Sequence, residues 1–154
     1  MAHRIYLDAC ALGRLFDLPA EPRVRKEFEA MQTIFRMIAD KEIDWHASTT
    51  LVAEIRRNRN DEDRMGAMAL LSFASKMLEL ESTESLRAVT LNQVGYGATD
   101  AIHLAIAEAS TATLLTTDDR FLKRARRGVG TPLVRVVNPV EWLREVNHAA
   151  YTNP

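Results

Sequence analysis

The chain has 154 residues, of which 47% are hydrophobic and 27% are charged, and its formal net charge is −1. This length and composition fit a single domain, residues 1–154, with a sizeable apolar core. The nearly balanced charge excludes a protein that binds nucleic acid through its overall charge, so any basic surface must be local.

The first half of the chain alternates short apolar strands with helices. Residues 4–7, RIYL, form a short buried strand. An amphipathic helix follows over residues 24–38, where apolar residues recur at intervals of four and three. Residues 42–48, EIDWHAS, are a second strand, and Ser48 or the threonine after it caps the next helix. After the polar turn NRNDED, a largely apolar helix is expected over residues 65–77.

Two adjacent helices are expected next. One spans residues 83–94 and ends at Gly95, where a residue free to adopt positive φ is needed. The other, GATDAIHLAIAEA at residues 97–109, is apolar nearly all round. A helix with that pattern should be buried.

Two apolar strands and a helix complete the chain. The strands are TATLLTT, residues 111–117, and LVRVV, residues 133–137. The sequence NPVE then supplies an N-cap asparagine, a first-position proline and an early acid, so a last helix should run over residues 139–146. Residues 147–154 are expected to fray.

The strands are continuous apolar runs, and they alternate with helices along the chain. Strands of that kind are typical of a parallel sheet that helices cover on both faces. We therefore predict an α/β fold. No repeat, low-complexity tract or linker interrupts the sequence, which favours one domain.

Targeting and redox signals are sparse. Cys10 is the only cysteine, so the chain cannot form an internal disulfide, which fits a reducing compartment. The N-terminal stretch MAHRIYLDAC lacks the apolar run of a signal peptide. The most apolar stretch, residues 101–107, is far too short to span a membrane. We therefore expect a cytoplasmic protein with no membrane partner.

Four acids can be placed near one edge of the predicted sheet. Asp8 and Asp118 directly follow two of the strands, and parallel sheets bind ligands beyond the carboxyl ends of their strands. Asp100 lies in the first turn of the buried helix, where the helix dipole favours a carboxylate. Glu54 lies in the helix after the second strand, among apolar neighbours.

Each acid also has a purely structural alternative. Asp118 could cap the helix that begins near Arg120, Asp100 could be an ordinary first-turn acid, and Glu54 could be a partly exposed helix acid. Asp8 is harder to explain in this way, because an acid directly after a buried strand has few structural reasons. The convergence of several acids at one sheet edge is what favours a site.

Clustered carboxylates repel one another, and a divalent cation relieves that repulsion. Oxygen donors without Cys or His ligands suit Mg²⁺ or Mn²⁺. Such cations assist reactions at phosphate, so the acids point to phosphodiester hydrolysis. Aspartate-nucleophile phosphatases fit less well, since they need a second acid where this chain has Cys10.

Four motifs follow one another along the chain: YLDACAL, STTLVAEIRRN, GATDAIHLAIAEA and LLTTDDRFLKRA. In their order and approximate spacing they resemble the PIN-domain ribonucleases, and most closely the VapC-type toxins of bacterial toxin–antitoxin pairs. The most specific part is D-A-I-H-L-A followed by T-T-D-x-x-F. Because the motifs cover both ends of the chain and its middle, the resemblance extends to the whole domain.

The resemblance implies a PIN-like three-layer α/β/α fold with a central parallel sheet of four to five strands. It implies a Mg²⁺- or Mn²⁺-dependent endoribonuclease that hydrolyses phosphodiester bonds of single-stranded RNA. It also implies a homodimer that a cognate antitoxin protein inhibits. The catalytic, metal-coordinating acids would be Asp8, Glu54, Asp100 and Asp118, with Thr117 and Asp119 in auxiliary positions.

Basic residues lie at the ends of two of these motifs. Arg56 and Arg57 follow Glu54 in the second motif, and Lys123 and Arg124 follow Asp118 in the fourth. They could hold RNA phosphates, or they could simply be solvated helix faces. His103, three residues after the third-motif acid, is expected to be a hydrogen-bonded structural histidine.

The alternative to a nuclease is a non-catalytic PIN-fold scaffold that binds RNA or protein. A scaffold has no reason to keep four acids that repel one another. The presence of all four therefore favours the enzyme.

Overall fold

The structure is a computed structural model that describes residues 3–152. Within that range the strands are β1 (His3–Leu7), β2 (Ile43–Ser48), β3 (Lys76–Leu78), β4 (Thr113–Leu115) and β5 (Val136–Val137). The α-helices are α1 (Ala9–Gly13), α2 (Pro22–Ala39), α3 (Thr49–Arg56), α4 (Asp61–Leu70), α5 (Ser82–Gln93), α6 (Ala98–Ser110), α7 (Asp119–Arg126) and α8 (Pro139–Thr152). Two 3-10 turns, η1 (Arg14–Phe16) and η2 (Leu71–Phe73), extend α1 and α4.

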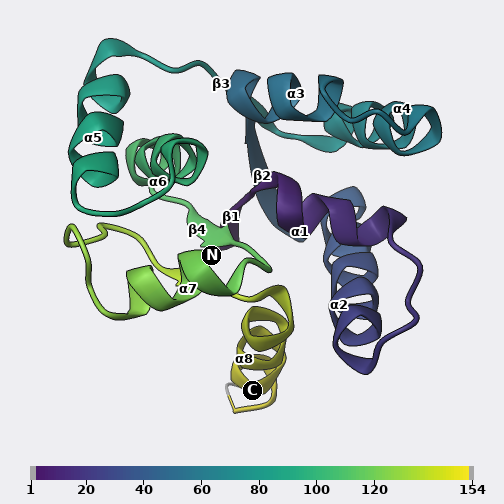
Figure 1. The fold of residues 1–154 in the computed structure, drawn as a ribbon. Coiled ribbons are helices and arrows are strands. Elements are labelled where there is room, and N and C mark those ends of the chain that lie inside the picture. The colour runs from purple at the N-terminus through teal and green to yellow at the C-terminus, as the bar shows by residue number, and fades with distance from the viewer. Residues whose placement is uncertain (1–2, 153–154) are drawn as a thin grey trace.

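The five strands pair in parallel in the order β3-β2-β1-β4-β5, which confirms the predicted parallel sheet of four to five strands. From β1 the chain adds β2 and β3 on one side and then returns to add β4 and β5 on the other (Figure 1). Sheets of this kind bind ligands where the strand order reverses, beyond the carboxyl ends of the strands. Here that point lies between β1 and β4.

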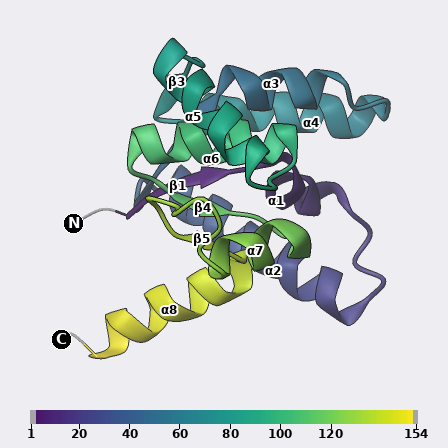
Figure 2. The same ribbon diagram turned by 60° about the vertical axis from the view of Figure 1, so that its left-hand side comes forward.

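Side chains of each strand alternate between two cores. On β1, Ile5 and Leu7 face one core and Tyr6 faces the other. The first core is completed by α1 to α4 and α8, and the second by α5, α6 and α7 (Figure 1). Helices α3 and α4 pack against each other beside α1 (Figure 2). The predicted three-layer α/β/α arrangement is therefore confirmed.

The helix predicted over residues 65–77 is wrong beyond Leu70. Helix α4 begins earlier, because Asn60 caps it by accepting a hydrogen bond from the backbone N–H of Asp63 (2.9 Å). It ends at Leu70, and residues 76–78 form β3 instead, paired with the edge of β2. Several apolar side chains of this predicted helix are exposed, for example Met65 at 69%.

The C-terminal helix is longer than predicted and two strands are shorter. Asn138 caps α8 by accepting from the backbone N–H of Val140 (2.8 Å), as the NPVE sequence predicts. The helix then continues to Thr152 and not only to Val146. Residues 153–154 lie outside the described residues. Strand β4 occupies only the central part of its predicted apolar run, and β5 only the last two residues of its run.

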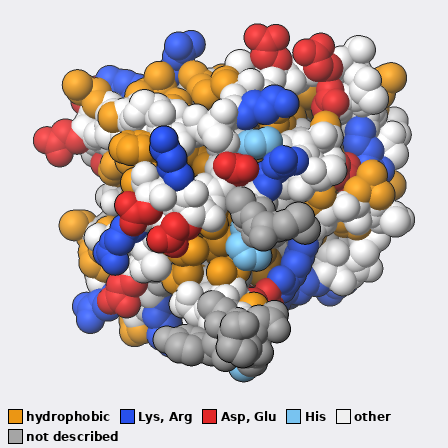
Figure 3. All heavy atoms as spheres, turned by 180° about the vertical axis from the view of Figure 1, so that it is seen from behind, with side chains coloured by type: hydrophobic (Ala, Val, Ile, Leu, Met, Phe, Trp, Pro, Cys, Tyr) orange, Lys and Arg blue, Asp and Glu red, His pale blue; other side chains and the backbone are white. Residues whose placement is uncertain are grey.

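The surface matches the balanced composition. Seen from behind, acidic and basic side chains are interspersed among hydrophobic ones (Figure 3). Among residues 3–152, no helix combines the length and apolar character that a membrane-spanning segment needs.

Candidate active site

Asp8 is the first residue after β1, and only 2% of its surface is exposed. It caps α1, because its Oδ1 accepts a hydrogen bond from the backbone N–H of Ala11 (2.9 Å). Its Oδ2 accepts a hydrogen bond from the hydroxyl of Thr116 (2.5 Å), which follows β4. Two neighbouring strands thus fix the orientation of this buried carboxylate.

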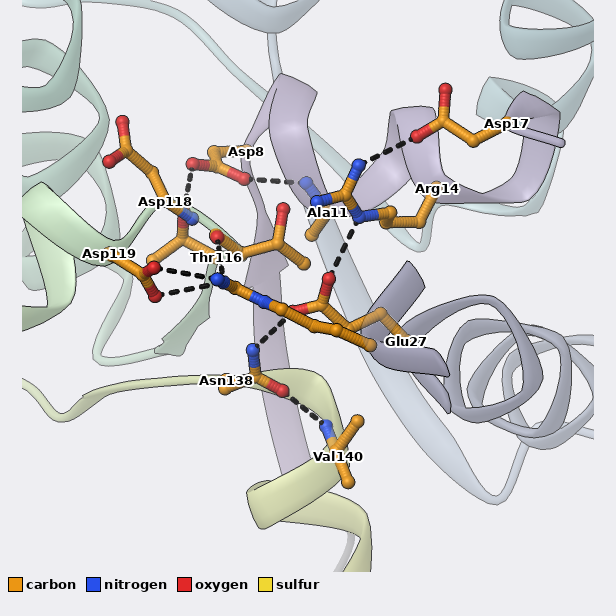
Figure 4. A network of polar contacts seen from close by, with 12 residues as sticks. Asp8, Ala11, Arg14, Asp17, Glu27, Thr116, Asp118, Asp119, Asn138 and Val140 are labelled. Atoms are coloured by element: carbon orange, nitrogen blue, oxygen red, sulfur yellow. Dashed lines mark hydrogen bonds and ion pairs between the residues drawn. The ribbon is translucent and has the colours of Figure 1, made fainter. Parts of the chain in front are cut away.

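Asp118 lies at the start of α7, where its Oδ1 accepts hydrogen bonds from the backbone N–H groups of Arg120 (2.9 Å) and Phe121 (3.4 Å). The backbone N–H of Asp118 donates to Thr116 Oγ1 (3.1 Å), the same hydroxyl that contacts Asp8 (Figure 4). Asp118 therefore caps a helix and also belongs to the acidic cluster. The two readings of this residue are compatible.

Asp100 and Glu54 reach the cluster from two helices. Asp100 lies in the first turn of α6, and its side chain is partly buried. Glu54 lies in α3 with 24% of its side chain exposed. Its Oε1 is hydrogen-bonded to Nε2 of His103, which lies one turn after Asp100 on α6. This contact ties the second motif to the third.

The pKa values show that the acids share one electrostatic environment. Burial, with a smaller contribution from Asp100, raises the pKa of Asp8 to about 6. Burial and then the charges of Asp118 and Glu54 raise the pKa of Asp100 to about 6. Partial burial and then the charges of all four acids raise the pKa of the Cys10 thiol. Contacts join the acids in two pairs: the Thr116 hydroxyl bonds to Asp8 and to the backbone N–H of Asp118, and Glu54 bonds to His103, one turn after Asp100 on α6.

The donor set fits a hard divalent cation, because it offers carboxylate oxygens of high negative charge. In their present orientations, no three His, Cys, Asp or Glu side chains of residues 3–152 are placed to hold a metal ion. Asp8, Asp118 and Glu54 are engaged by hydrogen bonds to the protein. A cation would bind the carboxylate lone pairs that these bonds leave free, and the four side chains would have to draw closer together around it.

The other two predicted positions contact Arg23 of α2. Asp119, the first residue of α7, pairs with Arg23 of α2 (2.6 Å). Thr117 offers its backbone oxygen to the same arginine (3.0 Å). The hydroxyl that contacts Asp8 is that of Thr116, which the sequence analysis did not single out.

Glu27, a buried acid outside the four motifs, links several elements beside the acidic cluster. Glu27, with 1% of its surface exposed, accepts hydrogen bonds from Arg14 Nε (2.9 Å) and Asn138 Nδ2 (2.7 Å) (Figure 4). Arg23 Nε lies 3.5 Å from the same carboxylate. Glu27 therefore joins α1, α2 and α8 below the acidic cluster. In the sequence, Glu27 resembles an ordinary surface acid of a helix, so no pattern predicted its burial.

A model of the PIN domain matches residues 5–127, a range that contains all four acids. The chain belongs to the PIN-domain family. No curated protein matches this PIN domain by sequence.

Solved structures share the fold of this PIN domain at low sequence identity. VapBC2 from Rickettsia felis, bound to a DNA fragment from its promoter, is 16% identical with a TM-score of 0.59, covering 88% of this chain and 98% of that one. PAE2754 from Pyrobaculum aerophilum is 20% identical with a TM-score of 0.57, and the match covers 97% of this chain and 90% of that one. VapBC-5 from Mycobacterium tuberculosis, of the VapBC family of toxin–antitoxin systems, is 15% identical with a TM-score of 0.50, covering 88% and 98%.

The basic residues lie at the ends of two helices of the PIN domain. Arg56 and Arg57 end α3 and are exposed, and Lys123 lies exposed in the last turn of α7. Arg124, also in the last turn of α7, is partly buried, and its positive charge opposes the rise in the pKa of Asp100. Of the four, Arg124 is thus the one whose charge lowers the pKa of Asp100.

Proposed function

We propose that this PIN domain is a Mg²⁺- or Mn²⁺-dependent endoribonuclease that hydrolyses phosphodiester bonds of single-stranded RNA, and that it is the cytoplasmic toxin of a toxin–antitoxin pair. PIN domains are generally nucleases. The observation that carries the proposal is the cluster of Asp8, Glu54, Asp100 and Asp118 where the strand order reverses. The four carboxylates would hold the cation. When bound, it supplies positive charge at the scissile phosphate and at the departing oxygen.

The chain's own groups would prepare that site. Thr116 and the amide of Ala11 hold Asp8 in one orientation before any ligand binds. Helix α7 would set Asp118 beside it through the capping bonds. Arg124 would neutralise part of the negative charge and attract an RNA phosphate towards Asp100.

In a non-catalytic scaffold Asp8 would serve only as the N-cap of α1, a role that an uncharged asparagine or serine can also fill. A rise in pKa from 3.8 to about 6 corresponds to a loss of folding stability on the order of 3 kcal/mol at neutral pH. A protein that only scaffolds would be more stable with a neutral residue at that position. The retained buried acid therefore favours catalysis.

Calorimetry and RNA cleavage test the proposal together. We expect Mn²⁺ or Mg²⁺ to bind with a millimolar or lower dissociation constant and to raise the melting temperature by mass action. Single-stranded RNA should be cleaved with either cation and remain intact in excess chelator. Absence of cation binding to the wild type, or equal binding by a double variant with Asp8→Asn and Asp118→Asn, would contradict the site.

The antitoxin proposal is supported by the fold shared with toxin–antitoxin proteins, such as the VapBC-5 complex. An amphipathic segment in a groove, with an arginine placed among the acids, would be a physical means of inhibition. A groove lined by Phe16, Phe35 and Leu70 between α2 and α4 has the apolar character that such a segment needs.

The proposed homodimer would use the exposed apolar face of α5. Leu86 is 72% exposed and Val89 is 56% exposed on this helix. We expect light scattering at micromolar concentration to give twice the 17.4 kDa of one chain. Replacing both residues by Asp should give a monomer, because two charges would be buried in the interface. The control Leu133→Asp, at an equally exposed residue elsewhere, should stay dimeric. A monomeric wild type would refute the dimer and leave the nuclease untouched.

A further inference from the structure

A chain of buried polar groups leads from the core of the sheet to Glu54. The hydroxyls of Ser48 and Tyr6 are 2.6 Å apart, and the Tyr6 hydroxyl lies 2.5 Å from Nδ1 of His103. Nε2 of His103 is in turn hydrogen-bonded to Glu54 Oε1. Ser48, Tyr6 and His103 are each at most 1% exposed. The four residues come from β1, β2, α3 and α6.

The hydrogen atoms of this chain can be assigned from its two ends. The backbone N–H of Leu51 donates to Ser48 Oγ (3.1 Å), and a carboxylate at Glu54 can only accept. His103 therefore donates from Nε2, and in the neutral imidazole Nδ1 then accepts from Tyr6. The Ser48 hydroxyl then donates to the Tyr6 oxygen. Burial raises the pKa of Tyr6 far above its usual range, so its hydroxyl keeps the hydrogen that this assignment needs.

We propose that His103 is a positioning residue for Glu54, which it holds by donation from Nε2 so that the remaining carboxylate lone pairs face the cation. This inference rests on the proposed function. Tyr6 and Ser48 fix the tautomer and ring orientation of His103, and His103 fixes the carboxylate. Groups that hydrogen-bond to metal ligands typically change metal affinity by 10- to 100-fold when they are removed.

Mn²⁺ affinity of the full chain tests the inference without measuring activity. His103→Leu should lower the affinity by roughly 10- to 100-fold. His103→Gln places an amide donor near the position of Nε2 and should restore most of it. His46→Leu is the matched control, since His46 is also buried and bonds to Ser110 through Nδ1 (2.5 Å), and it should leave the affinity unchanged.

A double-mutant cycle separates positioning from general loss of structure. In a Glu54→Ala background, His103→Leu should cause no further loss of Mn²⁺ affinity, because the group that it positions is gone. If His103→Leu lowers the Mn²⁺ affinity as much in the Glu54→Ala background as in the wild type, the inference is overturned. If His103→Leu does not fold, Tyr6→Phe is measured in its place. Tyr6→Phe should lower the Mn²⁺ affinity by about threefold to tenfold. An unchanged affinity would likewise overturn the inference.

The tautomer gives a readout that needs no cation. ¹⁵N NMR of the metal-free wild type should show His103 with hydrogen on Nε2 and an unprotonated, hydrogen-bonded Nδ1. A hydrogen on Nδ1 alone would overturn the inference. A wild type that binds no Mn²⁺ would remove the proposed function as well. A wild type that binds Mn²⁺ together with a His103→Leu variant of equal affinity would remove only the role of His103.

Discussion

Asp8→Asn should reduce RNA cleavage by more than about 100-fold and should stabilise the metal-free protein. Asparagine keeps the shape, and its side-chain oxygen can still accept from the Ala11 amide. The change removes a charge that lies in a nearly closed site. Cleavage of a short single-stranded RNA and urea unfolding at pH 7 are the two measurements. A wild-type cleavage rate would show that Asp8 is not a metal ligand.

The stabilisation should depend on pH in a defined direction. The pKa of Asp8 in the folded chain, about 6, lies above its unfolded value of 3.8. The folded state therefore holds its proton more tightly, and stability is lost as pH rises from about 4 to about 6. The same holds for Asp100. Asp8→Asn should remove the Asp8 share of this loss, on the order of 3 kcal/mol at pH 7.

A control variant that loses one negative charge elsewhere separates the effects of Asp8→Asn from a general effect of net charge. Glu42→Gln removes one negative charge from an exposed turn at the amino end of β2, and it should leave both cleavage and the pH profile nearly unchanged. A divalent cation should reduce the difference in free energy of unfolding between the wild type and Asp8→Asn, because it binds tightly only to the folded wild type. If this difference is the same with and without the cation, Asp8 is not a metal ligand.

The fold could be predicted from the sequence where local pattern and tertiary environment agree. RIYL and the helix over residues 24–38 carry the periodicity of the surfaces that they bury, and both are found within two residues of their expected bounds. The helix predicted over residues 65–77 is right only as far as Leu70, because residues 76–78 pair with β2 instead. Strand β3 depends on its pairing with β2, which no local pattern encodes.

Asp8 and Asp118 could be placed because each follows a strand that was visible in the sequence, and Asp100 and Glu54 because the helices that contain them were visible. The residues that hydrogen-bond to these acids could not be predicted from the sequence. Thr116, and not Thr117, contacts Asp8, because the pairing of β4 with β1 decides which residue of the TTDD run faces that carboxylate. The His103–Glu54 bond joins residues 49 positions apart on two helices. Such contacts depend on tertiary packing.

Asp118→Asn and the removal of Lys123 and Arg124 should give opposite results. Asparagine is as good an N-cap as aspartate, so α7 should remain intact. Cation affinity should fall and RNA cleavage should stop, because a carboxylate ligand is lost. RNA affinity at low salt should stay the same or rise, since a charge that repels phosphate is gone.

Replacing Lys123 and Arg124 by Ala should instead weaken RNA binding and leave all four acids in place. If each residue holds one phosphate, the slope of log affinity against log salt should become shallower by about 1.4 for a single strand. Arg126 and Arg135 provide the matched control, because they are paired with Glu141 and Glu145 of α8. Replacing those two by Ala removes the same charge and should leave the slope near that of the wild type. Filter binding of a short single-stranded RNA over a salt series measures all three proteins. Equal slopes for the two double variants would mean that Lys123 and Arg124 only solvate the end of α7.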